Sequence, residues 1–139
     1  MWEVPKLCAK TRAVDRQAYK NYLAKADEHR EAMQACYERG LWNAAVVNAI
    51  HCAISASDAL TVFYIGFRNA GERHTDVLGL MQKTGIDQRE LSPKLSQLSS
   101  LLSIKNLAEY EERLMGREDA EAARKSCERF HSWVRAKLP

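Results

Sequence analysis

Four polar side chains recur at helical spacing in the middle of the chain: Asn48, His51, Ser55 and Asp58. Successive residues of an α-helix are rotated by roughly 100°, so steps of three, four and three place all four on one face. A buried imidazole or carboxylate is costly unless it is hydrogen-bonded or paired, so this stripe needs partners on neighbouring helices or on a second subunit. The commoner arrangement is a structural one, in which hydrogen-bonded polar residues fix the register of the helices or of a dimer interface. The alternative is a ligand-binding or catalytic site.

The stripe lies in a segment, 41–68, that contains no lysine, arginine or glutamate before its end. Its other residues are mostly Ala, Val, Ile, Leu, Phe and Tyr, a pattern typical of a helix surrounded by other helices. The run is long enough to span a bilayer, but Asp58 alone would cost about 2.5–3.5 kcal/mol at the membrane centre. We therefore predict the central helix of a soluble bundle, without a membrane partner.

The rest of the chain also has helical patterns, and no segment alternates in the way of a convincing strand. We expect an all-α, antiparallel up-and-down bundle of about five helices. Residues 1–139 would form one domain, with 1–14 a poorly ordered or peripheral segment. Besides the central helix, the predicted helices span 15–39, closed by Gly40, about 76–83, about 90–115 with a break at 103–105, and 117–138.

Composition narrows the class of protein only in part. The net charge of +3, from 21 basic and 18 acidic side chains, neither requires nor excludes a polyanionic partner. The N-terminal residues lack the apolar run of a signal peptide, so we expect a cytoplasmic protein. The cysteines show no metal-binding spacing and are expected to be small hydrophobic residues in a reducing compartment; they are Cys8, Cys36, Cys52 and Cys127.

Common catalytic motifs are absent from the sequence: there is no Gly-rich phosphate loop, no H-E-x-x-H string and no triad at recognisable spacing. The remaining histidines, His29, His74 and His131, form no ligand set with His51 and Asp58, so no metal or cofactor is expected. Basic residues of the last helix can either follow a phosphate backbone or simply solvate a surface helix. They are Arg124, Lys125, Arg129, Arg135 and Lys137.

Three features together resemble the HEPN superfamily over residues 18–138: the long small-residue helix with its polar seam, the loop ending in His74, and the segment 105–110, Lys-Asn-Leu-Ala-Glu-Tyr. The resemblance implies a compact helical bundle that usually dimerises. Many members are metal-independent ribonucleases, often in toxin–antitoxin or defence systems. Others are small non-nuclease bundles that form complexes with minimal nucleotidyltransferases or are proposed to bind nucleotides.

The hallmark of the family is an Arg, usually a polar residue such as Asn, three to five further positions, and then a His. By analogy the Arg would steady the phosphate and the His would support attack by the ribose 2′-hydroxyl in a dimer groove. The matching positions here are Lys105, Asn106 and Tyr110. Lysine lacks the bidentate fork of arginine, and tyrosine, with a pKa of about 10, is a poor base at neutral pH. The motif is therefore degenerate, with Lys105 and Tyr110 as the candidate catalytic pair.

A second string also fits the motif, from Arg68 and Asn69 to His74. It straddles a glycine turn, whereas the family motif belongs near the start of a later helix, so we interpret the match as coincidental. If the match is real, Arg68 and His74 are the catalytic pair.

The sequence thus predicts a dimeric, non-catalytic or weakly catalytic module that partners a minimal nucleotidyltransferase or binds a nucleotide or RNA. The alternatives are a metal-independent endoribonuclease of a toxin–antitoxin or defence system, and a purely structural adaptor whose seam sets register. The expected binding groove consists of Asn48, His51, Ser55, Asp58, Lys105, Asn106 and Tyr110.

Overall fold

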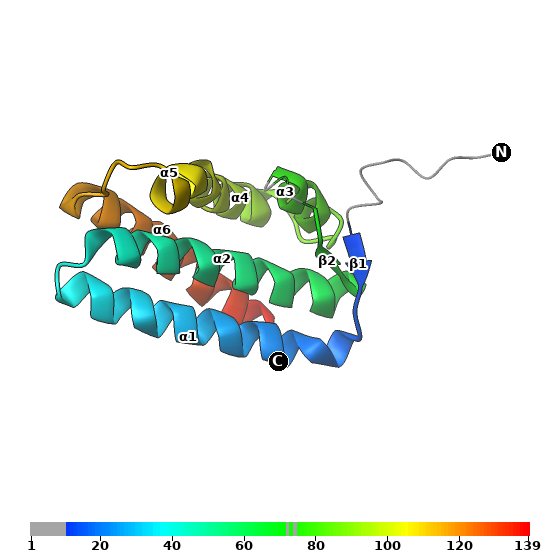
Figure 1. Cartoon of the computed structure of the whole chain (residues 1–139). Helices are drawn as coiled ribbons and strands as arrows, with labels where there is room; N and C mark the ends of the chain where they lie inside the picture. Colours follow the sequence, from blue (N-terminus) through cyan, green and yellow to red (C-terminus); the bar gives the residue numbers. More distant parts are fainter. Residues whose placement is uncertain (1–10, 72, 74) are drawn as a thin grey trace.

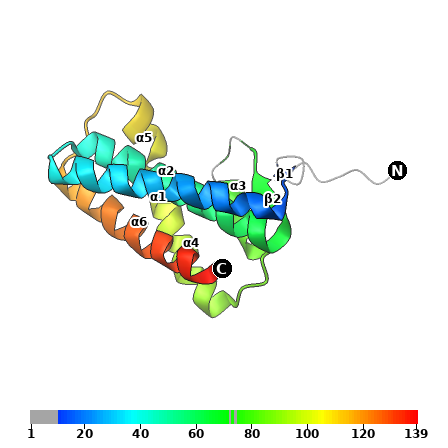
Figure 2. The same ribbon diagram turned by 90° about the horizontal axis from the view of Figure 1, so that it is seen from below.

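A computed structural model describes residues 11–71, 73 and 75–139. These residues form an all-α bundle, as predicted, in which α2 lies between α1 on one side and the layer of α3, α4 and α5 on the other, with α6 packed across them (Figure 1; Figure 2). A 3-10 helix, Arg16–Ala18, precedes α1. The helices are α1 (Tyr19–Glu38), α2 (Trp42–Ile65), α3 (Thr75–Gln82), α4 (Gln88–Ser103), α5 (Lys105–Tyr110) and α6 (Arg117–Lys137).

A tight turn joins α1 to α2 and makes them antiparallel. Gly40 ends α1 with a φ of 72°, a left-handed conformation that glycine adopts without a Cβ clash. The backbone N–H of Leu41 donates back to the carbonyl of Cys36 at 2.9 Å. These contacts satisfy backbone groups that the helix end leaves free, and the chain reverses within the three residues 39–41.

The central helix α2 contacts every other helix. Its length and apolar composition would suit a membrane span, with a mean hydropathy of 1.4 over its most apolar window, but 67% of that window is buried inside the protein. Small residues such as Ala49, Ala53 and Ala56 are completely buried and let α2 approach its neighbours closely. Larger side chains such as Met33 and Phe130 fill the core on either side of it.

The predicted break between residues 103 and 105 is confirmed, because Ile104 separates α4 from α5. Asn43 of α2 makes two hydrogen bonds to the backbone of α5 and of the segment that follows it. Its Nδ2 donates to the carbonyl of Ala108 at 3.0 Å, and its Oδ1 accepts from the N–H of Met115 at 3.3 Å. One side chain therefore fixes α5 and the connection to α6 against the start of α2.

The expectation that no strand forms was wrong. Two short strands, β1 (Thr11–Ala13) and β2 (Phe67–Asn69), pair antiparallel. Helix α2 ends earlier than predicted because Gly66 takes a φ of 74° and turns the chain into β2. A strand of three residues is too short to show an alternating sequence pattern. These two strands form because the two distant segments pair with each other. Of the segment 1–14, residues 1–10 lie outside the described residues, whereas 11–13 are part of this sheet.

The cysteines that the structure describes behave as expected for small hydrophobic residues. Cys52 and Cys127 are completely buried, Cys36 is partly buried, and all three are free thiols. Cys8 lies outside the described residues.

Candidate functional site

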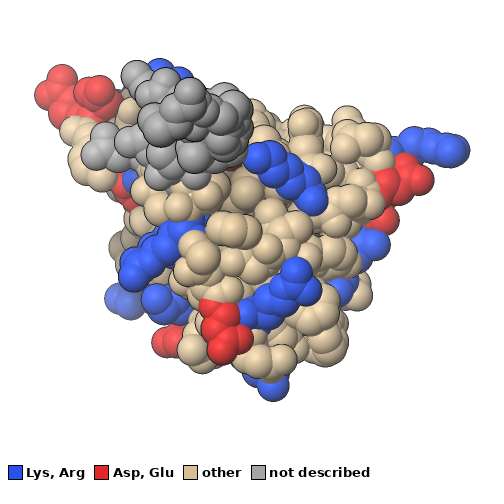
Figure 3. Space-filling model, turned by 90° about the vertical axis from the view of Figure 1, so that its right-hand side faces the viewer, with Lys and Arg blue, Asp and Glu red and all other residues tan. Residues whose placement is uncertain are grey.

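One end of the molecule gathers arginine side chains from neighbouring elements. Arg12 of β1 stands opposite Arg68 of β2 in the sheet register, so both side chains project from the same face. Arg16 lies over Gly66, with its Nε 3.6 Å from the position that a Cβ there would take. Figure 3 looks onto this end and shows Lys and Arg side chains spread over it. We call Arg12, Arg16 and Arg68 the arginine cluster.

The arginine cluster carries positive charge without acidic partners. Among the residues that the structure describes, none of its three members forms an ion pair. Like charges directly opposite each other on adjacent strands repel, so the pairing of Arg12 with Arg68 is unfavourable on its own. A bound anion would relieve that repulsion.

The basic residues of α6 differ from the cluster because most of them are engaged. The guanidinium of Arg124 stacks over the ring of Tyr37, 4.8 Å from its centroid. Three others form ion pairs: Lys125 with Glu121 at 3.2 Å, Arg135 with Asp27 at 2.8 Å and Lys137 with Glu90 at 2.6 Å. Carboxylates therefore balance three basic residues of α6, whereas no member of the arginine cluster has such an ion pair among the described residues.

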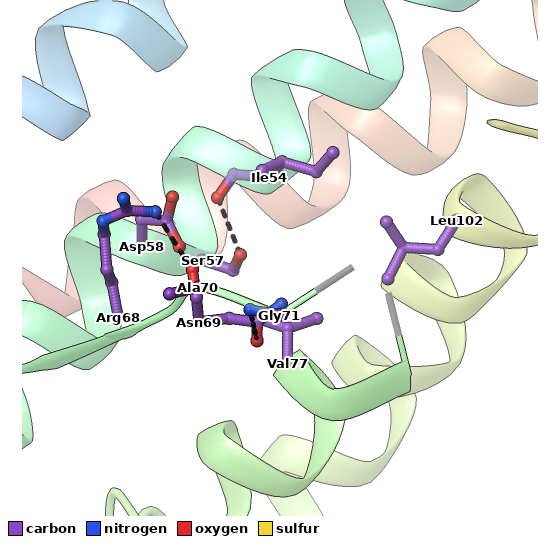
Figure 4. A pocket seen from close by; sticks show the side chains of 9 residues that line it. All are labelled: Ile54, Ser57, Asp58, Arg68, Asn69, Ala70, Gly71, Val77 and Leu102. Carbon is purple, nitrogen blue, oxygen red and sulfur yellow. Dashed lines mark hydrogen bonds between the residues drawn. The ribbon is translucent and has the colours of Figure 1, made fainter. Parts of the chain in front are cut away.

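A pocket of about 210 Å³ opens beside the arginine cluster, between α2, β2, α3 and α4 (Figure 4). One wall is apolar, formed by Ile54, Val77 and Leu102, and the opposite side carries polar groups. We call this cavity the Asp58 pocket. Its lining consists of Ile54, Ser57, Asp58, Arg68, Asn69, Ala70, Gly71, Val77 and Leu102.

Asp58 is the buried titratable group of this pocket. The residue is only 8% exposed, yet its carboxylate accepts no hydrogen bond from the residues that the structure describes. Burial raises the pKa of Asp58 to about 7, and the positive charges of Arg68 and Lys25 counteract part of that rise. A carboxyl group that is half-ionised near neutral pH and lines a cavity is poised to exchange a proton or to accept hydrogen bonds from a ligand.

The loop after α2 is held by its own polar groups. Arg68 donates from a terminal nitrogen to the carbonyl of Asn69 at 3.0 Å, and the N–H of Gly71 donates to Oδ1 of Asn69 at 3.2 Å (Figure 4). Because Oδ1 of Asn69 is occupied as an acceptor, its amide NH₂ is left as a donor beside the pocket. The turn at Gly66 thus returns the chain so that Arg68 and Asn69 face the helix residue Asp58.

The predicted polar stripe on α2 does not form one continuous seam. Asn48 lies beside α1: its Oδ1 is 3.1 Å from Nδ1 of His29, and its Nδ2 donates to the carbonyl of Ala44 at 3.0 Å. The ring of His51 lies 5.5 Å from that of His29, and Nε2 of His51 is 2.5 Å from a carboxylate oxygen of Glu109. These residues join α1, α2 and α5.

The other half of the stripe lies elsewhere. Ser55 is partly buried and has no hydrogen bond to a described residue, and Asp58 faces the pocket near β2. Of the seven residues predicted to border one binding groove, only Asp58 lines the Asp58 pocket. Contacts through His29 and Glu109 instead connect four of the others, Asn48, His51, Lys105 and Tyr110, away from that pocket. The predicted residues are thus divided between two places, because helical spacing fixes the face of a helix but not which neighbour covers each turn.

The predicted catalytic pair Lys105 and Tyr110 does not form an acid–base arrangement. The ammonium of Lys105 donates to Glu109 at 2.7 Å and lies 5.4 Å from the ring centroid of Tyr110. Tyr110 itself is 73% exposed, and Asn106 is exposed as well. Lys105 is thus occupied as the partner of a buried carboxylate, and its neighbours point to solvent.

Glu109 links Lys105 of its own helix, α5, to His51 of α2. Burial would raise its pKa, but the hydrogen bonds and charges of Lys105 and His51 outweigh burial and lower it. The carboxylate therefore stays ionised and binds both partners, with its side chain 13% exposed and that of Lys105 12% exposed. This geometry is that of a structural ion-pair network that attaches α5 to α2.

The second motif-like string is placed only in part. Arg68 and Asn69 line the Asp58 pocket, while His74 lies outside the described residues. Sequence analysis did not identify Arg12, Arg16 or Asn69 as site residues in their own right. For Asn69, the sequence offered one indication, its position next to Arg68. For Arg12 and Arg16 it offered none, because no spacing rule predicts that β1 lies next to β2. In the described part of the chain, no group of three or more His, Cys, Asp or Glu is arranged to hold a metal ion.

The fold and site together define a class: a small antiparallel helical bundle with an arginine-rich end and a polar pocket beside its central helix. The sequence model of the HEPN domain matches residues 19–137, from the first residue of α1 to the last residue of α6. The chain belongs to the HEPN family, as the resemblance predicted. No curated protein matches the chain.

Proposed function

We propose that the protein is a non-catalytic or weakly catalytic HEPN module that binds RNA or a nucleotide through its phosphate groups. The observation that carries the proposal is the pairing of Arg12 with Arg68 at the edge of the Asp58 pocket, where neither forms an ion pair with a described residue. Arginine suits phosphate because its planar fork donates two parallel hydrogen bonds. The cluster is therefore the phosphate-binding surface of the module.

Binding of a fluorescent single-stranded RNA octamer, measured by anisotropy over a range of salt concentrations, tests the proposal. We expect affinity to fall linearly with the logarithm of salt concentration, by a slope of about −0.7 for each phosphate neutralised. Replacing Arg12 and Arg68 together by alanine should weaken binding about tenfold or more and make the slope shallower by one to two units.

Arg39→Ala is the matched control. Arg39 is an exposed arginine at the α1–α2 turn, at the other end of the bundle from β1 and β2 (Figure 1). Arg39→Ala removes one positive charge, as Arg12→Ala or Arg68→Ala does singly, without touching the arginine cluster, so RNA affinity should stay within about twofold of the unmodified protein. Equal losses in Arg39→Ala and in the double variant would show non-specific attraction and refute the proposed site.

A second candidate function is a metal-independent endoribonuclease that uses Arg68 and His74. It is favoured by the position of Arg68 and Asn69, the first two residues of the Arg–Asn–His string, in the lining of a pocket. Lys105 and Tyr110 are the weaker catalytic pair, since Glu109 occupies the lysine. In this mode Arg68 would hold the phosphate while His74 takes the proton of the 2′-hydroxyl.

Incubating the protein with mixed RNA in EDTA separates the two functions. The binding-module proposal expects bound but intact RNA. Cleavage that is lost in His74→Ala and in Arg68→Ala, but kept in Tyr110→Ala, would establish the ribonuclease and assign its residues. Cleavage lost only in Tyr110→Ala would instead restore Lys105 and Tyr110 as the pair.

Further parts of the proposal are supported by membership of the HEPN family alone. These are a homodimer, a minimal nucleotidyltransferase as partner protein, and a place in a toxin–antitoxin or defence system. Sedimentation velocity of the purified protein tests the dimer, and co-purification with the product of a neighbouring nucleotidyltransferase gene tests the partner. A monomer that still binds RNA would remove the dimer from the proposal and leave phosphate binding in place.

A further inference from the structure

The carboxylate of Asp58 lines the Asp58 pocket and has no hydrogen-bond donor among the residues that the structure describes. The residue is 8% exposed. Figure 4 shows its side chain on the polar side of the cavity, next to the guanidinium of Arg68. A carboxylate that lines an open cavity is available to the hydrogen-bond donors of a ligand.

The chemistry of the pocket restricts what those donors can be. An ionised carboxylate only accepts hydrogen bonds, and its two oxygens match a ligand with two adjacent N–H donors. Arg68 lines the same cavity and favours an anionic group on the same ligand. Ile54, Val77 and Leu102 provide an apolar wall that suits a flat ring. The ligand must therefore combine an apolar ring, a two-donor edge and a negative charge.

We propose that the Asp58 pocket binds a guanine base, with N1–H and N2–H donating to the two carboxylate oxygens of Asp58. The inference rests on the proposed function, because it names the base whose phosphates the arginine cluster would hold. Guanine is the nucleobase with two adjacent donors on its pairing edge. Adenine and cytosine each present one donor beside an acceptor, and uracil presents a single N–H between two carbonyls, so each leaves a carboxylate oxygen unpaired.

The remaining groups of the pocket agree with this orientation. The amide NH₂ of Asn69 is a donor without an acceptor among the described residues and suits O6 of guanine. The cavity, at about 210 Å³, is smaller than the roughly 300–1,000 Å³ usual for whole drug-sized ligands. It accommodates one base, while ribose and phosphate remain outside, beside Arg68.

Calorimetric titration with mononucleotides at pH 8 tests the base preference directly. GMP should bind at least about tenfold more tightly than AMP, CMP or UMP, the discrimination expected of a two-bond contact. IMP, which lacks the N2 amine, should lie between GMP and AMP. An octamer of uridines with one central guanosine should likewise bind more tightly than the same octamer with a central adenosine. If only the octamers show a preference for guanine, the ligand is RNA. If the mononucleotides show the same preference, free guanine nucleotides are ligands as well.

Asp58→Asn supplies a specificity swap. Asparagine presents one acceptor and one donor, which match the pairing edge of adenine but cannot replace the two oxygens that accept from N1–H and N2–H of guanine. The variant should therefore lose at least about tenfold in GMP affinity and bind AMP at least as tightly as GMP. Glu28→Gln, which removes an exposed carboxylate of α1 outside the pocket, is the charge-matched control and should leave the preference unchanged.

The outcomes separate this inference from the proposed function. Equal affinity for all four bases, with octamer binding that still depends on Arg12 and Arg68, would overturn the guanine site and leave phosphate binding standing. Absence of binding to every nucleotide and octamer would overturn both. Should Asp58→Asn fail to fold, as judged by circular dichroism, the base series on the unmodified protein decides the question by itself.

Discussion

Asp58 and Arg68 lie next to each other on the polar side of one pocket but form no ion pair with each other (Figure 4). Arg68 lowers the pKa of the carboxyl, yet burial prevails and holds that pKa at about 7. A direct ion pair would neutralise both groups and close the site. Without an ion pair, the pocket keeps an acceptor at Asp58 and a positive charge at Arg68, whose guanidinium is hydrogen-bonded only to the carbonyl of Asn69 among the described residues. A ligand with a donor edge and a negative charge requires this arrangement.

Asp58→Asn should stabilise the protein in a pH-dependent manner. The folded-state pKa of about 7 lies above the ordinary value of 3.8, so the folded protein holds a proton that the unfolded chain releases between these values. Stability contributed by this proton is complete below the unfolded pKa and is lost as pH rises to about 7. Relative to the unmodified protein, the variant should gain up to about 4 kcal/mol in free energy of unfolding at pH 8 and almost nothing at pH 4.

Urea denaturation at both pH values measures this difference. Other titrating groups are common to the two proteins and cancel in the comparison. A gain of equal size at pH 4 and pH 8 would contradict a raised pKa for Asp58.

Gly66 and Gly79 should respond in opposite directions to alanine. Gly66 caps α2 with a φ of 74°, so a Cβ there is strained and should cost about 1–2 kcal/mol. Gly79 lies inside α3, with no neighbouring atom within 4 Å of the position that a Cβ would take, so alanine should stabilise by about 0.5–1 kcal/mol. Thermal unfolding of both variants checks the pair, and a neutral Gly66→Ala would mean that the turn into β2 is not strained.

The amphipathic spacing and the glycines were sufficient to predict most of the helical bundle, because burial of an apolar face dominates helix placement. The buried core of α2, the turn at Gly40 and the break near Ile104 all follow from local pattern. The small sheet did not, because β1 and β2 are defined by each other and carry no local signal.

The candidate site was predicted less well, and for a physical reason. Spacing identified Asp58 as a polar residue on a buried helix, which the structure confirms. It could not show that Arg68 and Asn69 return to face Asp58, since that depends on the turn at Gly66. Nor could it show that Lys105 is already paired with Glu109, an interaction set by tertiary packing around His51.

Asn43→Ala should loosen the α5–α6 connection. The substitution removes the donor to the carbonyl of Ala108 and the acceptor of the Met115 N–H, and both backbone groups are partly buried. Leaving such groups unpaired costs about 1–3 kcal/mol. Hydrogen exchange should show faster exchange at Met115 and in α5, while α1 stays protected. Unchanged exchange at Met115 would mean that Asn43 does not hold this connection.

Glu109→Gln tests whether the cluster around α5 is structural. The carboxylate joins Lys105 at 2.7 Å and His51 at 2.5 Å, and glutamine keeps the shape but removes the charge that both partners face. Lys105, 12% exposed, would then be a nearly buried cation without a counter-ion, so we expect a loss of about 1–3 kcal/mol at pH 7. Because the pKa of Glu109 is lowered in the folded state, its stabilisation is present above the ordinary value of 4.5 and disappears as pH falls through the folded pKa, so the loss should shrink at pH 3.

The matched control is Glu112→Gln, at an exposed position just after α5, which should change stability by less than about 0.5 kcal/mol. RNA binding should be unaffected in Glu109→Gln, since the arginine cluster lies on other elements, β1, β2 and the 3-10 helix. If Glu109→Gln instead left stability intact and abolished RNA binding, Lys105 and its neighbours would be part of the binding surface after all. The phosphate-binding site would then have to be moved from the sheet end of the bundle to α5.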